Sequence, residues 1–390
     1  MIKGSEDTFM IYLDNAATSW PKPPMVADRV REAILHQGGN PGRSGHAMSL
    51  AAGKLLEEAR NKLAHLFNVA DPHRIVFALN ATDALHLAIN GSLEEGGHVI
   101  ISSMEHNAVT RPLHRYQERG GCVTKIPMDP VSGVDPENVK KALRKDTRLV
   151  VMTHASNVCG TVNPIKEIGL VCREAGVPLL VDASQSAGCL PVDVEAMHID
   201  MLAFPGHKSL LGPTGTGGLY IREGVEMAPV RLGGTGLHSE EQDQPREMPF
   251  RYESGTQNVQ GLAGLAAGLD YIEEEGLDAI ESKEESLTSL LLEGLASIEG
   301  LSLYGPPKGV RRAPVVSFTL ENVDPIEIAA ILDQSFAIAV RAGLHCAPDA
   351  HGTIGTLAAG GTVRVSPGPY NTEEDIQTVV DAIGEIAEAF

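Results

Sequence analysis

The chain has 390 residues, 43% of them hydrophobic and 21% charged, and 51 acidic against 31 basic side chains give a formal net charge of −20. This composition is that of a globular protein of about two or three domains. The acidic charge argues against nucleic acid as a partner, because phosphate binding needs a basic face. No apolar run of about 18 residues is present, so we expect no membrane span and no membrane partner.

The first residues and the cysteines bear on the cellular compartment. Residues 1–10 are polar and acidic and lack the apolar segment of a secretory signal. The five cysteines are odd in number, and none of them forms a C-x-x-C pair. A reducing compartment, the cytoplasm, is therefore expected.

Short apolar runs alternate with helical patterns through the first two-thirds of the chain. The patterns predict a helix over 82–89 and strands over 74–79, 98–101, 149–152, 179–181, 199–204 and 218–221. Nearly continuous apolar strands are typical of a mainly parallel sheet that helices cover on both faces. Such sheets bind ligands at the C-terminal ends of their strands, so the polar residues at these ends are the first candidates.

Residues 233–250 interrupt this alternation. The segment begins with the glycine-rich run 233–236 and continues with the charged side chains of Glu240, Glu241, Asp243 and Arg246. Two interpretations stay open: a mobile loop over a cleft, or a plain surface excursion.

Beyond residue 255 the pattern changes to long helices. A helix is predicted over 280–298, a strand over 315–318 and a further helix over 326–332. The first helix has an apolar stripe formed by Leu287, Leu290, Leu291 and Leu295. A last helix opens with a capping box, Thr372 to Asp375, and is predicted to bury Ile376, Val379, Val380 and Ile383. We expect an α/β protein whose last third is a separate, smaller α+β domain.

Several common chemistries are excluded by missing motifs. The sequence contains no G-x-x-x-x-G-K-[ST] nucleotide loop, no H-E-x-x-H motif and no cysteine pair with zinc spacing, so we expect no metal site. The glycine-rich segment 212–218 is by itself a weak phosphate signal.

What remains is a set of polar residues just after the predicted strands. These are Thr82, His106, Asn157, Asp182, Gln185 and Lys208. Thr82 is either an anion-binding residue at a helix N-terminus or an ordinary N-cap. An aspartate after so apolar a strand needs a cation or full hydrogen bonding. A lysine in this place is harder to explain as a solvated surface residue.

Together these residues fit one cofactor, pyridoxal phosphate. It needs a lysine for a Schiff base, a carboxylate that keeps its ring nitrogen protonated, and a phosphate cup, and a flat ring adds stacking. Lys208, Asp182, Thr82 and His106 supply these groups in that order.

At this point the sequence resembles a known family, the cysteine desulfurases in the class V aminotransferase branch of fold-type I pyridoxal phosphate enzymes. The resemblance runs almost end to end, with landmarks at 12–18, 105–107, 156–158, 181–185, 206–208, 253–256, 341–347 and 361–364. It implies a large cofactor-binding domain with a mainly parallel central sheet over 14–260. It also implies a small α+β domain from 1–13 and 261–390.

The resemblance implies a role for each residue around the cofactor. Lys208 forms the Schiff base and moves protons, Asp182 pairs with the ring nitrogen, and His106 stacks on the ring and serves as an acid-base group. Gln185 is placed at the ring's phenolic oxygen. The phosphate ligands implied are Thr82, the backbone of Ala81, His207 and, from the other subunit of a homodimer, Thr256.

The resemblance also implies the substrate contacts and the reaction. Arg364 clamps the substrate carboxylate with its planar fork, and Asn157 lies beside cofactor and substrate. Cys346 attacks the sulfur of L-cysteine, which leaves alanine and a persulfide on the enzyme for a protein acceptor. Because this attack needs a thiolate, activity should fall at acid pH unless His345 or another cation stabilises it.

The other cysteines are interpreted as structural. Cys122, Cys172 and Cys189 are expected to be buried. Cys159 lies two residues from Asn157, and of its two interpretations, a residue near the cleft or a structural cysteine, the structural one is favoured.

The segment around Cys346 resembles a short-loop subgroup of the desulfurases, and the chain departs from the family in two places. Pro205 stands where a phosphate-binding serine is common, and proline has neither hydroxyl nor N–H. Leu344 stands where the subgroup has a second histidine, which puts the acceptor's identity in doubt.

Other functions remain open from the sequence. Selenocysteine lyase activity cannot be separated from desulfurase activity, and a class V aminotransferase or lyase on another amino acid would make Cys346 incidental. A scaffold without catalysis is a third class, and a cofactor absorbance would exclude it. The sequence does not tell whether the sulfur serves iron–sulfur cluster assembly, thiolated RNA or a cofactor.

Overall fold

The computed structural model describes residues 10–41 and 45–390. Two predictions fall largely outside the described residues. The segment 1–10, which lacks a secretory signal, lies outside them except for Met10. Most of residues 1–13, predicted to belong to the small domain, also lies outside them. No helix in the described ranges is long and apolar enough to cross a membrane.

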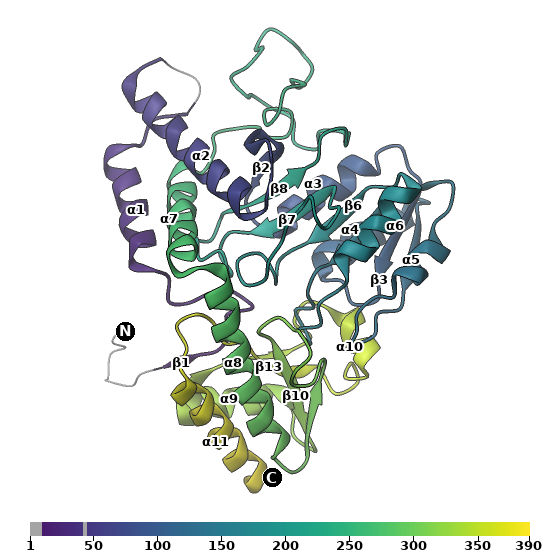
Figure 1. The fold of residues 1–390 in the computed structure, drawn as a ribbon, viewed down its shortest axis with the longest axis vertical. Helices are drawn as coiled ribbons and strands as arrows, with labels where there is room; N and C mark the ends of the chain where they lie inside the picture. The colour runs from purple at the N-terminus through teal and green to yellow at the C-terminus, as the bar shows by residue number, and fades with distance from the viewer. Residues whose placement is uncertain (1–9, 42–44) are drawn as a thin grey trace.

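A seven-stranded sheet forms the centre of the larger body, the upper part of Figure 1. In sheet order its strands are β2 (Ile75–Ala78), β8 (Gly217–Ile221), β7 (Met201–Pro205), β6 (Leu179–Asp182), β5 (Thr147–Thr153), β3 (His98–Ser102) and β4 (Cys122–Ile126). Neighbouring strands are parallel except at β8, which runs antiparallel to both β2 and β7. The predicted mainly parallel sheet is therefore confirmed.

Side chains on both faces of this sheet are apolar, which is why its strands are nearly continuous in hydrophobicity. One face packs against α2 (Ala47–Leu66), α6 (Ile165–Ala175) and α7 (Val259–Glu275), and the other against α3 (Ala81–Ser92) and α4 (Asn107–Glu118). Along β5, for example, Val150 and Met152 join the first core, and Leu149 and Val151 the second. Two further helices, α1 (Pro24–His36) and α5 (Pro136–Ala142), and the 3-10 turn Pro72–Arg74 complete this body.

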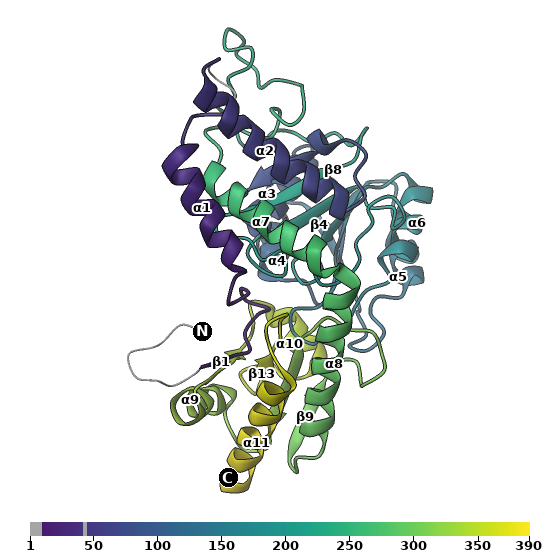
Figure 2. The same cartoon turned by 60° about the vertical axis from the view of Figure 1, so that its left-hand side comes forward.

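A four-stranded antiparallel sheet forms the smaller body below it (Figures 1 and 2). Its strands are, in order, β12 (Arg341–Gly343), β13 (Thr362–Val365), β10 (Val316–Leu320) and β9 (Leu301–Tyr304). A two-stranded pair, β1 (Ile11–Tyr12) with β11 (Ile338–Ala339), lies beside it. The helices here are α9 (Pro325–Phe336) and α11 (Glu373–Ala389). The short helix α10 (Pro348–Ile354), which lies between β12 and β13 in the chain, packs through Ala350 against the core of the large sheet.

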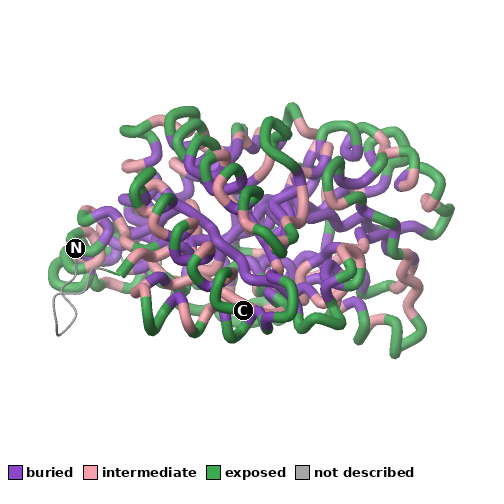
Figure 3. The backbone as a smooth tube through the Cα atoms, turned by 90° about the horizontal axis from the view of Figure 1, so that it is seen from below, coloured by how far each residue is buried: buried purple, intermediate pink, exposed green. Residues whose placement is uncertain are grey.

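Helix α8 (Leu277–Ala296) joins the two bodies (Figure 2). Ile280 at its start belongs to the core of the large sheet, whereas Leu287, Leu291 and Leu295 belong to the core of the small sheet. Helix α7, directly before it, packs on the large body. The domain division at 260 and 261 stays a prediction. Figure 3 shows the buried backbone running through the interior, with the exposed segments around it.

The structure corrects several details of the sequence predictions. Leu290 is exposed, so that the predicted stripe of α8 has three buried members among its four. The capping box of Thr372 and Asp375 is present, but Val380 of the same helix is only half-buried. Strand β4 was not predicted, because it mixes apolar with polar side chains that are largely half-buried at the edge of the sheet.

Candidate active site

A cavity of about 240 Å³ lies where the strand ends of the large sheet face the small sheet. Every site residue predicted from the sequence lines it except Cys346 and Thr256. Those that do are Ala81, Thr82, His106, Asn157, Asp182, Gln185, His207, Lys208 and Arg364. They come from six separate stretches of the chain, and the topology brings them together as expected of polar residues after parallel strands. No residue of 233–250 lines this cavity, and the segment forms the loop at the top of Figure 1.

Asp182 is the last residue of β6, and Lys208 follows the neighbouring parallel strand β7. The Asp182 carboxylate is buried and accepts hydrogen bonds from the backbone N–H of Ser184, at 2.9 Å, and from its hydroxyl. Burial, and then the positive charge of Arg364, lower the pKa of Lys208 to about 8, while Asp182 acts in the opposite direction. The neutral amine is therefore available closer to neutral pH than in an exposed lysine.

His106 is held at the N-terminus of α4. Its Nδ1 accepts a hydrogen bond from the backbone N–H of Ala108 at 3.0 Å, so the ring is a side-chain cap. Burial lowers the pKa of His106, although the charge of Asp182 raises it in part. With Nδ1 an acceptor, the proton of the neutral ring lies on Nε2, and the cap fixes the ring at the wall of the cavity.

The N-terminus of α3 provides backbone N–H groups at the other end of the cavity. Asn80 is the N-cap, and its side chain accepts from the N–H of Asp83 at 2.9 Å. Thr82 therefore stands in the first helical turn, so its interpretation as an ordinary N-cap is wrong. The first turn of a helix attracts anions through its free N–H groups, and Ala81 and Thr82 both line the cavity there.

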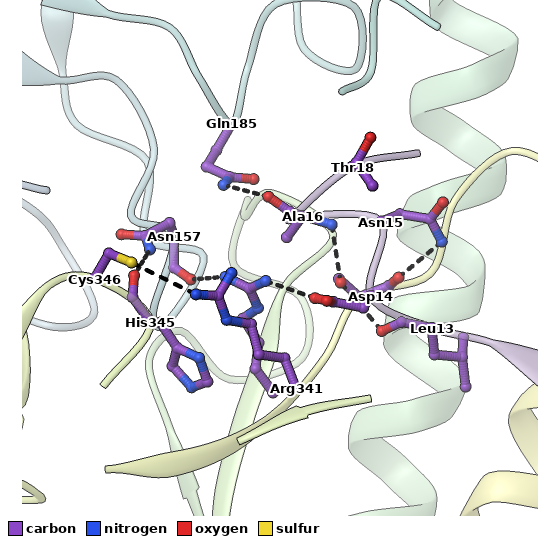
Figure 4. Close-up of polar contacts among 12 residues, drawn as sticks. Leu13, Asp14, Asn15, Ala16, Thr18, Asn157, Gln185, Arg341, His345 and Cys346 are labelled. Atoms are coloured by element: carbon purple, nitrogen blue, oxygen red, sulfur yellow. Dashed lines mark hydrogen bonds and ion pairs between the residues drawn. The ribbon is translucent and has the colours of Figure 1, made fainter. Parts of the chain in front are cut away.

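A segment near the start of the chain crosses the same site, and reasoning from single residues did not find it. The Gln185 amide donates to the carbonyl of Ala16 at 3.0 Å, as Figure 4 shows. The Thr18 hydroxyl and the Lys22 ammonium both donate to the carbonyl of His207, at 3.0 and 2.6 Å. The only sequence signal for these contacts was the family landmark at 12–18.

The His207 ring also contacts this segment. Its Nδ1 lies 3.1 Å from the Thr18 hydroxyl. Burial, with the charges of Lys208 and Lys22, lowers the pKa of His207 to about 4. The ring is therefore neutral near pH 7 and offers a hydrogen bond rather than a charge.

Arg364 is the most buried cation of the site, with 1% of its surface exposed. One guanidinium nitrogen donates to Asp14 Oδ1 at 2.7 Å and another to the carbonyl of Asn157 at 3.0 Å. The Nε atom has no partner among the described residues. An arginine fixed on two sides and unsatisfied on a third is prepared for a further anionic ligand. Asp14, which the sequence reasoning did not single out, is thus part of the site.

Cys346 lies in a tight turn at the rim of the cavity. His345 and Cys346 both have left-handed backbone conformations, with φ of 47° and 59°, and Gly343 has φ of 103°. The backbone N–H of Asn107 donates to the Cys346 carbonyl at 2.8 Å, which ties the turn to the large sheet. The thiol is exposed, and an Arg341 nitrogen lies 3.5 Å from its sulfur (Figure 4). Two adjacent non-glycine residues at positive φ are uncommon, and such conformations cluster at active sites and ligand-binding sites.

His345 does not supply a cation beside this thiol. Its Nε2 lies 3.0 Å from the Thr362 hydroxyl, and the Asn157 amide donates to its carbonyl at 2.7 Å. Burial, and then the charge of Arg364, lower the pKa of His345 to about 2. The ring is therefore neutral at physiological pH.

The remaining cysteines are remote from this chemistry. Cys159, Cys172 and Cys189 are buried, and burial raises the pKa of Cys172 to about 12 and that of Cys189 as well. Cys122 was expected to be buried but is half-buried, because it lies on the edge strand β4 and accepts from Arg144 at 3.1 Å.

Thr256 and the two family departures complete the set. Thr256 is exposed and lines a second cavity, with Phe250 and Glu253 among its neighbours, so one subunit does not bring it to the first cavity. Pro205 ends β7 and lines the main cavity, so no hydroxyl stands there. Leu344 is exposed in the turn of Cys346.

Comparisons with known proteins agree with this arrangement. The family described as Aminotransferase class-V matches residues 11–379. A probable cysteine desulfurase of Methanothermobacter thermautotrophicus is 38% identical over 97% of this chain and 94% of its own length. A cysteine desulfurase of Escherichia coli O127:H6 is 34% identical over 97% of this chain and 93% of its own. The apo structure of a cysteine desulfurase from Thermococcus onnurineus NA1 superposes with a TM-score of 0.91 at 35% identity, covering 98% and 95% of the two chains.

Proposed function

This chain belongs to the class-V aminotransferase family as a cysteine desulfurase, and on that premise we propose that it converts L-cysteine to L-alanine and takes the sulfur as a persulfide on Cys346. The observation that carries this assignment is a single cavity lined by Lys208, Asp182 and Arg364, with the exposed thiol of Cys346 at its rim. The parts that recognise an amino acid and the part that accepts its sulfur are thus adjacent.

The donor set fits pyridoxal phosphate, the cofactor on which this family depends. The cavity offers an amine at Lys208, a buried carboxylate at Asp182, the fixed flat ring of His106 and helical N–H groups at Ala81 and Thr82. Gln185 and His207 add hydrogen-bonding groups at the same wall. These are the amine, counter-charge, stacking surface and anion cup that the cofactor requires.

The bound cofactor would supply an aldehyde that condenses with amines and an electron sink for the substrate's carbon atoms. Asp182 is placed to keep a ring nitrogen protonated, since its carboxylate is buried and held by Ser184. Lys208, whose pKa burial lowers to about 8, is suited to give and take a proton near neutral pH. The Nδ1 atom of His106 is engaged in the helix cap, so Nε2 is the ring nitrogen that is free for acid-base catalysis.

Arg364 and Asn157 are proposed to bind the substrate. The guanidinium is fixed by Asp14 and by the Asn157 carbonyl, and its unpartnered Nε leaves donor capacity for a carboxylate. A bidentate arginine–carboxylate pair orients the amino acid as well as holding it. The Asn157 amide, tied to the His345 carbonyl, links this clamp to the Cys346 turn.

A second copy of the chain is proposed to complete the phosphate site with Thr256. Support comes from large apolar side chains on the surface of this part of the large body. Leu79 is 61% exposed just before α3, Leu232 is 72% exposed, and Phe250 lies beside Thr256 at the second cavity. Exposed apolar side chains of this size are typical of an interface.

The persulfide requires a reduced thiol and an acceptor. We propose a reducing, cytoplasmic location, since all five cysteines are free. We also propose a protein acceptor that reaches Cys346 beside the exposed Leu344. The departures at Pro205 and Leu344 leave the Lys, Asp, Arg and Cys of the site in place.

The proposed function is tested by measuring alanine formed from L-cysteine with a reductant present. Wild type, Cys346→Ala and the matched control Cys122→Ala are compared, with the cofactor absorbance of each recorded. We expect Cys346→Ala to lose about a hundredfold or more of its rate with an unchanged absorbance, and Cys122→Ala to behave as wild type. Alanine at the wild-type rate from Cys346→Ala would exclude this thiol as the nucleophile. No alanine from a wild type with bound cofactor would exclude the substrate.

A further inference from the structure

Two arginines lie directly opposite one another on neighbouring strands of the small sheet. Arg341 of β12 pairs in register with Arg364 of β13, and both side chains line the main cavity. Like charges opposite one another across a strand pair are destabilising unless an anion compensates them. The pair therefore points to two anionic partners at this wall.

The two guanidinium groups differ in what satisfies them. Arg364 has the Asp14 carboxylate at 2.7 Å. Within residues 10–41 and 45–390, the one hydrogen-bond partner of Arg341 is the sulfur of Cys346, at 3.5 Å, and no carboxylate forms an ion pair with it. The thiolate of Cys346 is thus the one anion among the described residues that is placed to pair with Arg341.

The other charged groups near the thiol do not replace Arg341. Arg364 is engaged by Asp14 and the Asn157 carbonyl, and His345 is neutral because its pKa is lowered to about 2. His106 is a helix cap whose pKa is lowered by burial. Arg341 is close enough to lower the pKa of His106 and of Lys208, so its charge acts on the interior of the cavity as well as on its rim.

We propose that Arg341 is a catalytic residue that binds the sulfur anion on Cys346, first as the thiolate and then as the persulfide. This inference rests on the proposed function. The Cys346 thiolate forms a bond to the substrate sulfur while the substrate's carbon–sulfur bond breaks, and the electron pair of the broken bond stays on carbon. That carbon takes the proton of the transferred sulfur and becomes the methyl group of alanine. The negative charge ends on the outer sulfur of the persulfide, within reach of the same guanidinium.

The two arginines then divide the two anionic parts of the reaction. Arg364 holds the carboxylate and Arg341 holds the sulfur, and their register across β12 and β13 sets the spacing between them. A charged donor at a sulfur anion is stronger than a neutral one. The strained turn of His345 and Cys346 brings the sulfur to this donor.

The test compares wild type with Arg341→Gln and Arg341→Lys in the holoenzyme without cysteine. The rate at which iodoacetamide alkylates Cys346 at pH 7 is followed by peptide mass. This reagent is neutral, so the guanidinium does not attract it. We expect Arg341→Gln to slow alkylation about fivefold to tenfold and Arg341→Lys to retain most of the rate. Arg144→Gln is the matched control, because Arg144 contacts Cys122 and should leave Cys346 unaffected.

A second measurement follows the persulfide after one turnover with L-cysteine. A small thiol is then added, which takes the outer sulfur and restores the Cys346 thiol. The mass of one additional sulfur atom on the Cys346 peptide should disappear about fivefold faster in Arg341→Gln than in wild type. Alkylation at the wild-type rate in a folded Arg341→Gln would overturn the proposal. So would an Arg341→Gln variant whose one defect is a raised KM for cysteine, because Arg341 would then bind the substrate carboxylate. If Arg341→Gln does not fold, Arg341→Met takes its place. Slowed alkylation of Arg341→Met supports the proposal, and alkylation at the wild-type rate overturns it. The alkylation assay contains no cysteine and needs no turnover. A wild-type enzyme that forms no alanine would therefore contradict the proposed function without deciding the role of Arg341.

Discussion

The two halves of the site are built in different ways. Asp182 ends one strand that is buried on both faces and Lys208 follows another, so the large sheet fixes them. Cys346 stands instead on a short turn of the small sheet, exposed and at positive φ, and a few contacts hold it. The cofactor half is rigid because of its topology, whereas the sulfur half depends on individual contacts, which suits a thiol that must meet both a substrate and an acceptor.

The largest expected effect breaks the cofactor half. Lys208→Ala removes the single lysine amine that lines the cavity, counted over the described residues, and activity should fall by about a thousandfold or more. The absorbance of the bound cofactor should change at the same time, and an absorbance spectrum with an alanine assay checks both. Lys140→Ala, at an exposed position of α5, is the control and should match wild type. A fully active Lys208→Ala would contradict the assignment of this half.

The next effect breaks the sulfur half and leaves the cofactor half intact. Gly361 has φ of 110°, and a Cβ there would collide with the backbone of Gly343, which precedes the Cys346 turn. Gly361→Ala should therefore displace β12 and lower the desulfurase rate by about a hundredfold, with a wild-type cofactor absorbance.

The control for this substitution lies in the neighbouring helix. Gly352 of α10 has open space around its Cβ direction, so Gly352→Ala should leave the rate within about twofold of wild type. If Gly361→Ala also lost the cofactor absorbance, the two halves would not be separable in the way their construction suggests.

A smaller effect sharpens the link between the halves. Asp14→Asn removes the carboxylate that holds Arg364 at 2.7 Å but keeps an acceptor oxygen. We expect KM for cysteine to rise about tenfold with little change in kcat, as steady-state kinetics would show. Asp349→Asn is the control. Asp349, on the neighbouring helix α10, forms an ion pair with Lys125 of β4, and its loss should change KM by less than about twofold. If both variants raised KM for cysteine equally, the effect of Asp14→Asn could not be assigned to its contact with Arg364.

The comparison also explains what the sequence could predict. Strand ends are visible as apolar runs followed by polar residues, so the places of His106, Asp182 and Lys208 followed from pattern alone and the cavity contains all three. Asp14 and Arg341 were not singled out, because their meaning comes from contacts with Arg364 and with the Cys346 turn. Hydrophobic periodicity carries no record of such pairings between polar residues.

The N-terminal boundaries show a second limit. An N-cap is one of the two interpretations of Thr82 from the sequence. The N-cap of α3 is instead Asn80, two residues earlier, whose side chain accepts from the backbone N–H of Asp83. Both residue types are good caps, and the end of β2 at Ala78 rather than at 79 decided between them. Thr82 lines the cavity, but it is not the N-cap of α3, and its part in binding phosphate stays a prediction.

The smallest expected effect concerns α8, which joins the two bodies. Glu284 is buried in it, and its Oε2 has no partner among the described residues. Burial raises the pKa of Glu284 from 4.5 to about 8, Lys283 lowers it in part, and Glu281 raises it further. Because the folded protein holds this proton more tightly than the unfolded chain, the group stabilises the fold fully below pH 4.5. That contribution is lost as the pH rises through about 8.

Glu284→Gln should therefore lose less thermal stability than wild type between pH 6 and pH 9, by about 2 °C or more in Tm. Glu285→Gln, at the exposed next position of the same helix, should follow the wild-type curve. Thermal unfolding monitored by circular dichroism across this pH range measures the difference. Parallel curves for wild type and Glu284→Gln would mean that the carboxyl group is hydrated in the folded protein. Water would then reach the part of α8 that joins the two bodies, although Leu287, three residues along the same helix, is buried in the core of the small sheet.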